Sequence, residues 1–159
     1  MELKLFAEKW GDQDRIPKPV EASELQEVEQ TFGIVLPIDY VEQVTAIGLP
    51  WPPHLLSAIA DEQVELHDLS ELCTPNEIVS ETEGWHPIGL PENLLVIGND
   101  SMGSKFCFDM KELEGDRKSV AAIFFWDHDF NDTAKVANSF SEWIAQYLGP
   151  WSDEWFATS

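Results

Sequence analysis

Three neighbouring segments with β-strand character constrain the fold of this chain more than any other feature of its sequence. Residues 94–97 form a continuous apolar run, and residues 105–109 alternate, with Phe106 and Phe108 on one face. Residues 120–126 form a second apolar run, and turn-forming residues separate the three segments. Consecutive strands joined by short turns pair side by side, so we predict an antiparallel meander in the second half of the chain.

Helical signals stand on both sides of these strands. One helix is predicted over residues 22–32, with Ser23 as N-cap and Gln26 completing a capping box. A second is predicted over residues 37–47, since proline suits the first turn of a helix. A closing helix is predicted to begin after Ser139 and to end where Gly-Pro follows it.

The remaining segments carry weaker signals. Residues 1–20 are predicted to form a lead-in that is either helix or strand, and residues 55–60 a turn. Residues 63–66 are predicted to form a short strand, and residues 69–72 a brief helix capped by Asp68. The aromatic tail over residues 151–156 is predicted to dock on the body of the domain. Residues 75–91 are predicted to be an irregular acidic segment with Trp85 in its middle. The order of helices, strands and a final helix predicts a single α+β domain over residues 1–159.

Acidic charge limits the kinds of partner that this chain can have. Asp and Glu number 30 against 9 Lys and Arg, so the formal net charge is −21. Residues 19–104 contain no Lys or Arg and hold sixteen carboxylates. Such a field repels nucleic acid and anionic lipid and attracts basic proteins. Solubility alone is the competing interpretation of the same charge.

Three further features of the sequence lead us to expect a cytoplasmic protein. No apolar run reaches the length of a membrane-spanning helix, and the first residues do not resemble a signal peptide. Cys73 and Cys107 are too few for a disulfide framework and are expected to be free thiols. No motif for a cofactor is evident, and none is expected.

Three groups of residues together indicate a family. In order, these are Leu25-x-x-x-Glu29 with Phe32-Gly33 and Leu36-Pro37-x-x-Tyr40, then Val96-Ile97-Gly98-Asn99-Asp100 with Gly103 and Cys107-Phe108-Asp109, and finally Ser139-Phe140-x-x-Trp143-Ile144. This order and spacing resembles the SUKH superfamily, which includes fungal cell-wall assembly regulators and many bacterial immunity proteins. Residues 47–49 depart from the family pattern, with Ile-Gly-Leu where members usually have Asn-Gly.

The resemblance implies a fold and a class of function. The implied fold is α+β, with a mixed or mainly antiparallel sheet and helices packed mainly on one side. The implied activity is the binding of a partner, because the superfamily has no shared catalytic machinery. Members that act as bacterial immunity proteins bind and neutralise toxins, often nucleases or deaminases, whereas the fungal relatives act as scaffolds or regulators of cellular proteins.

The most enzyme-like segment is residues 127–132. Asp127, Asp129 and Asn131 copy the first, third and fifth ligand positions of a calcium-binding EF-hand loop. Asp132 stands where that loop needs glycine, and Asn138 stands where it needs a bidentate glutamate. We therefore predict no bound metal and no catalytic residue, and interpret the segment as a solvated acidic loop.

These observations predict an acidic protein that binds another protein. The expected partner is a basic toxin domain such as a nuclease, and the alternative is a cellular protein docked by a scaffold. Neither nucleic acid nor a membrane is expected to bind, and the free protein should be a monomer or weak dimer. The residues predicted to contact the partner are Glu62, Glu65, Glu81, Glu83, Trp85, Asp127 and Asp129. For Trp85, packing onto the body remains an alternative to a role as an interface anchor.

Overall fold

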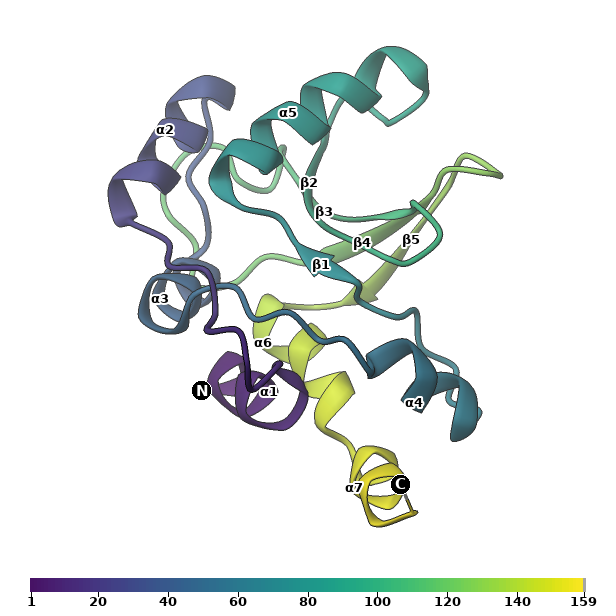
Figure 1. Ribbon diagram of the computed structural model, residues 1–159. Coiled ribbons are helices and arrows are strands. Elements are labelled where there is room, and N and C mark those ends of the chain that lie inside the picture. The colour runs from purple at the N-terminus through teal and green to yellow at the C-terminus, as the bar shows by residue number, and fades with distance from the viewer. Residues whose placement is uncertain (159) are drawn as a thin grey trace.

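The computed structural model describes residues 1–158. The helices are α1 (Glu2–Trp10), α2 (Ala22–Phe32), α3 (Ile38–Ile47), α4 (Leu55–Asp61), α5 (Pro75–Trp85), α6 (Phe140–Ala145) and α7 (Pro150–Thr158), with short 3-10 turns η1 (His86–Ile88) and η2 (Gln146–Leu148). The strands are β1 (Glu71–Leu72), β2 (Leu94–Asn99), β3 (Lys105–Asp109), β4 (Ile123–Asp127) and β5 (Asp132–Ala137). The predicted α+β class is confirmed (Figure 1).

The strands form one antiparallel sheet in the order β1-β2-β3-β4-β5. Strands β2, β3 and β4 are the predicted meander, although β4 begins at Ile123 rather than at residue 120. A bulge interrupts the pairing of β2 with β3 between Val96 and Gly98. The N–H of Val96 donates to the hydroxyl of Thr82 in α5, 2.9 Å away, so the bulge ties this helix to the sheet.

Helices cover both faces of the sheet (Figure 1). Adjacent residues on a strand point to opposite faces. Phe106 packs against Trp143 of α6, with ring centroids 4.6 Å apart, whereas Lys105 extends to Trp85 of α5. Helices α1, α3 and α6 therefore lie on one side of the sheet, and α5 lies on the other.

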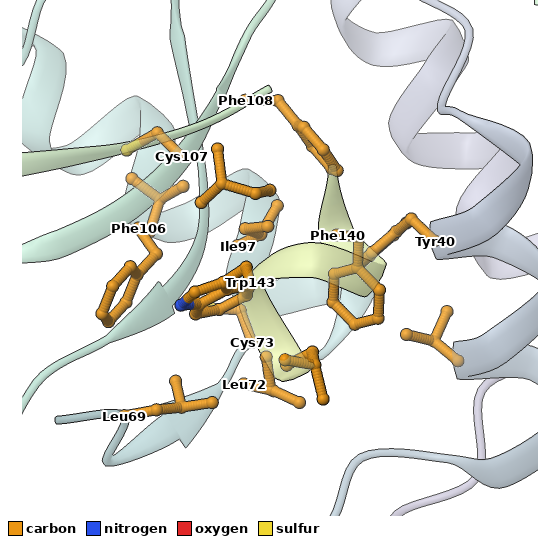
Figure 2. Packing of buried hydrophobic residues seen from close by; sticks show 14 of the residues in the cluster. Tyr40, Leu69, Leu72, Cys73, Ile97, Phe106, Cys107, Phe108, Phe140 and Trp143 are labelled. Carbon is orange, nitrogen blue, oxygen red and sulfur yellow. The ribbon is translucent and has the colours of Figure 1, made fainter. Parts of the chain in front are cut away.

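The core lies between the sheet and helices α3 and α6. Tyr40 of α3 makes edge-on contacts with Phe108 and Phe140, at centroid distances of 5.4 Å and 5.1 Å (Figure 2). The predicted core residues are buried except for Phe32, which is half-buried at the edge; they are Leu25, Val28, Leu36, Tyr40, Val44, Ile97, Phe108, Ile123, Phe125, Phe140, Ile144 and Tyr147. Trp143, which the prediction left out, is fully buried.

Several local predictions between the first helices and β2 were wrong. Residues 75–85 are not irregular, because Thr74 and Glu77 form a capping box that starts α5. Helix α2 uses Glu21 and Glu24 as its capping box instead of Ser23 and Gln26. Residues 63–66 form no strand, and Asp68 caps no helix; its carboxylate accepts hydrogen bonds from Ser101, and the chain then enters β1.

The two ends of the described chain pack on each other. The Trp10 ring of α1 contacts Trp151, Trp155 and Phe156 of α7, at centroid distances between 5.0 and 5.9 Å. Its indole N–H donates to the carbonyl of Tyr147, so the aromatic tail docks on the body as predicted. The closing helical segment ends before Gly149, as predicted, although Gly149 is extended, and a separate helix, α7, begins at Pro150.

From the sequence, Gly98 and Gly103 are both expected to be turn residues between the first two strands. Gly98 was interpreted as a turn residue, but it lies within β2, where an added Cβ would come within 3.2 Å of the Glu71 carbonyl oxygen. Gly103 does adopt a positive φ, at 93°, in the turn between β2 and β3. Among the described residues, no helix combines the length and apolar character needed to cross a membrane.

Candidate partner-binding surface

An aromatic cluster joins the end of α5 to one end of the sheet. Trp85 at the end of α5 meets Trp126 of β4 edge-on, with ring centroids 5.8 Å apart. The ring of His128, just beyond β4, lies 5.8 Å from Trp85. Trp126 is buried, whereas Trp85 and His128 are half-buried. Trp85 is therefore packed on the body along part of its ring and reaches the surface along the rest.

A buried cation lies beneath this cluster. Lys105 is 4% exposed, and its ammonium lies 4.7 Å from the centre of the Trp85 ring. The ammonium donates to the Asn99 side-chain oxygen at 2.7 Å and lies 3.5 Å from the Glu81 carboxylate. The Trp85 indole N–H donates to that same carboxylate at 2.9 Å. A buried charge needs a partner of opposite sign, so Glu81 neutralises Lys105 and holds the Trp85 ring in place.

A groove of about 300 Å³ separates α2 from α5. Half-buried Val79 supplies apolar surface to it, and Val28 and Pro75 line it from buried positions. Its acidic lining residues are Glu24, Glu27 and Glu83, and no Lys or Arg lines it. Glu24 is engaged in the capping box of α2, whereas Glu27 and Glu83 are exposed. The groove can therefore receive a cationic side chain whose aliphatic part packs on Val79.

The turn between β4 and β5 contains two of the predicted contact residues. One carboxylate oxygen of Asp127 accepts the N–H groups of Asp129 and Phe130, at 2.9 and 3.3 Å. Asn131 adopts a positive φ of 50°, and its side-chain oxygen accepts the Trp126 indole N–H at 2.8 Å. The segment interpreted as a solvated loop is thus the turn of a hairpin whose second strand, β5, was not predicted.

Asp127, His128 and Asp129 can bring one ligand atom each within 4.8 Å of one another. Two of these residues already make hydrogen bonds within the protein. The Asp127 carboxylate accepts backbone N–H groups of the turn, and the His128 Nδ1 lies 3.1 Å from the Ser104 hydroxyl. The three residues are consecutive on a hairpin turn, and they lack the glycine and distant glutamate of an EF-hand loop. This group has the chemistry to contact a cation weakly at the surface.

The seven predicted contact residues do not form one surface. Glu81, Trp85, Asp127 and Asp129 lie around the hairpin end of the sheet, and Glu83 lines the α2–α5 groove. Glu62 follows α4, and Glu65 lines a 220 Å³ pocket together with Phe106 and Trp143. That pocket opens on the α6 side of the sheet, away from α5. Successive side chains of β3 point to opposite faces of the sheet, so Glu65 near Phe106 is separated from Glu81 near Lys105. The sequence alone did not indicate this separation.

Burial and neighbouring groups shift the pKa values of titratable side chains near α5. Burial raises the pKa of the Glu71 carboxyl, and a hydrogen bond with Glu77 raises it further. The pKa of Glu77 is lowered by its hydrogen bonds with Thr74 and Glu71, which outweigh its partial burial. Burial also raises the pKa of the Cys73 and Cys107 thiols, so both are protonated and poor nucleophiles at neutral pH.

A comparison with protein families identifies the chain. Residues 19–146, from just before α2 to the η2 turn, match the model of the SMI1 / KNR4 family (SUKH-1). The chain belongs to this family. Membership in the SMI1 / KNR4 family confirms the SUKH resemblance and supports an immunity or regulatory role exerted through contacts between proteins. A search of curated proteins found no match. Helices α1 and α7 lie outside the matched residues.

Proposed function

We propose that this protein is a non-enzymatic immunity protein that binds and masks a basic toxin domain, such as a nuclease, in the cytoplasm. The observation that carries the proposal is the α2–α5 groove, which has carboxylates on both walls, apolar surface between them and no Lys or Arg in its lining. A toxin that acts on phosphates presents a cationic cleft, and carboxylates held on a rigid surface can occupy the places of those phosphates.

The distribution of cations supports the same conclusion. Lys105, the lysine of the aromatic cluster, is buried and neutralised by Glu81. Lys18 lies near Glu71 and Glu77 at the start of α5, and Lys18 does not line the groove. Arg117 is paired with Glu29, with a nitrogen–oxygen distance of 2.9 Å. These cations therefore do little to offset the acidic field outside α2 and α5, which steers a basic protein towards the groove.

The first test is a search beside the gene for this chain for a secreted toxin with a distinct C-terminal domain, whose absence would favour the scaffold. The second test is stopped-flow binding of that domain, purified and catalytically inactivated. We expect the association rate to fall steeply between low and physiological salt, because screening reduces the reach of surface charges to ~8 Å. Glu27→Lys with Glu83→Lys should slow association. Glu8→Lys with Glu154→Lys, on α1 and α7, is the matched control, with the same total charge change at two exposed positions outside the groove.

The outcomes separate the proposal from its alternative. Co-expression of the protein should protect cells from the active toxin domain. If the domain does not bind, or binds at a rate indifferent to salt, toxin masking by charge is wrong. A scaffold that docks a cellular protein would instead give no protection and no salt-dependent binding to this domain.

A further inference from the structure

Two apolar side chains project from neighbouring hairpin tips at one end of the sheet. Met102, in the turn between β2 and β3, is 74% exposed, and Phe130, in the turn between β4 and β5, is 82% exposed. Both turns lie at the same end of the meander, because Lys105 at the start of β3 pairs with Trp126 near the end of β4 (Figure 1). Because the two tips are adjacent, they place exposed apolar side chains from two turns at one end of the sheet, and grouped apolar surface marks contact sites more than a single exposed side chain does.

The two tips are held rigidly. Asp100 accepts the N–H groups of Met102 and Ser104, at 2.9 and 2.8 Å, as Asp127 does those of Asp129 and Phe130 in the other turn. The Ser104 hydroxyl contacts the ring and the backbone N–H of His128 and so links one turn to the other. Because both turns are ordered before binding, little conformational entropy is lost when their apolar side chains are covered.

Carboxylates surround the exposed phenylalanine and limit what can cover it. Asp129 and Asp132 are exposed on either side of Phe130, and Asp127 is half-buried beneath it. An anionic lipid surface would be repelled by these charges, and so would a second copy of a chain with a net charge of −21. A cationic protein surface that contains an apolar hollow satisfies both the ring and the carboxylates.

We propose that Phe130, with Met102 on the neighbouring tip, is an anchor that inserts into an apolar hollow in the cationic cleft of the bound toxin domain. This inference rests on the proposed function and adds a second contact region to the α2–α5 groove. The aspartates around the tip pair with cations at the rim of the hollow, while the ring is desolvated at its centre. Such a central aromatic group, excluded from water on binding, is the usual energetic focus of an interface.

The test uses the inactivated toxin domain described above and compares Phe130→Ala with Ile16→Ala. Ile16 is the matched control because it is 86% exposed and lies in the lead-in between α1 and α2. Phe130→Ala should weaken affinity by roughly 30-fold or more, mainly through faster dissociation, while Ile16→Ala should change it by less than about threefold. Thermal unfolding of both variants should match that of the parent, because neither side chain is buried.

The outcomes distinguish this inference from the proposed function. If the parent binds with the expected salt dependence but both variants bind equally well, the anchor is wrong and toxin masking stands. If Phe130→Ala instead abolishes self-association of the free protein, measured by sedimentation, and leaves toxin binding intact, the tip is a contact between copies and the inference is also wrong. If the parent does not bind the domain, the proposed function fails, and the anchor fails with it.

Discussion

Charge reversal at two nearby positions of α5 should have opposite consequences. Glu81 lies 3.5 Å from the buried ammonium of Lys105, whereas Glu83 is exposed at the α2–α5 groove. At an effective dielectric constant of about 20, the attraction at this distance is roughly 5 kcal/mol. The Glu81 side chain is 31% exposed, so solvent screens part of this attraction. We expect Glu81→Lys to lower the free energy of unfolding by about 3 kcal/mol, since it leaves a buried cation without its counter-charge.

Urea unfolding measures the difference. With a dependence on urea of about 2 kcal/mol per molar, the midpoint of Glu81→Lys should fall by roughly 1.5 M, while Glu83→Lys should stay within about 0.3 M of the parent. Glu81→Gln is an informative control: it keeps an acceptor for the Trp85 indole N–H but removes the charge, and it should fall between the two. Equal midpoints for Glu81→Lys and Glu83→Lys would show that Lys105 does not depend on this ion pair.

Three further predictions concern the core, the thiols and the effect of pH. Phe125→Ala should lower the free energy of unfolding by ~3–5 kcal/mol because the ring is buried against His67 and Phe106, and a loss below about 1 kcal/mol in urea would contradict this. Alkylation of Cys73 and Cys107 at pH 8 should occur only as fast as the protein unfolds, as followed by mass spectrometry; rapid labelling of the native protein would contradict their burial. The raised pKa of Glu71 means that the folded protein binds a proton at this carboxyl more tightly than the unfolded chain does. The ionised carboxyl therefore destabilises the folded state at pH values above the raised pKa. This destabilisation disappears as the pH falls below the ordinary pKa of glutamate, where both states are protonated. Glu71→Gln should therefore be more stable than the parent at pH 7, and an advantage that persists unchanged as the pH falls through that window would refute this cause.

The parts of the fold that could be predicted are those where apolar periodicity is strong. The strand runs at 94–97 and 105–109 are buried on both faces of the sheet, and the helix over residues 22–32 buries one face. Burial is what these apolar patterns record. Helix α5 was missed because few of its residues are apolar, and much of its attachment comes from Thr82, Trp85 and Glu81 through polar contacts. Its capping box was visible in the sequence and could have corrected the prediction.

The candidate site was less predictable than the fold because it depends on long-range pairing. The absence of Lys and Arg over residues 19–104 indicated an acidic surface, but it could not indicate that Lys105 turns inward to neutralise Glu81. The first four residues of strand β5, Asp-Thr-Ala-Lys, are exposed and show no apolar alternation, so periodicity gave no sign of the hairpin that displays Phe130. Its position follows only from the register with β4.

The contact between the two ends of the chain has a consequence for the protein during its synthesis. Trp10 donates its indole N–H to the carbonyl of Tyr147, which lies 137 residues later. A ribosome that adds about 5–20 residues per second needs on the order of ten seconds to cover that distance. Throughout this interval Trp10 lacks the aromatic side chains of α7 that cover it, so the packing of α1 is completed only after α7 has been made.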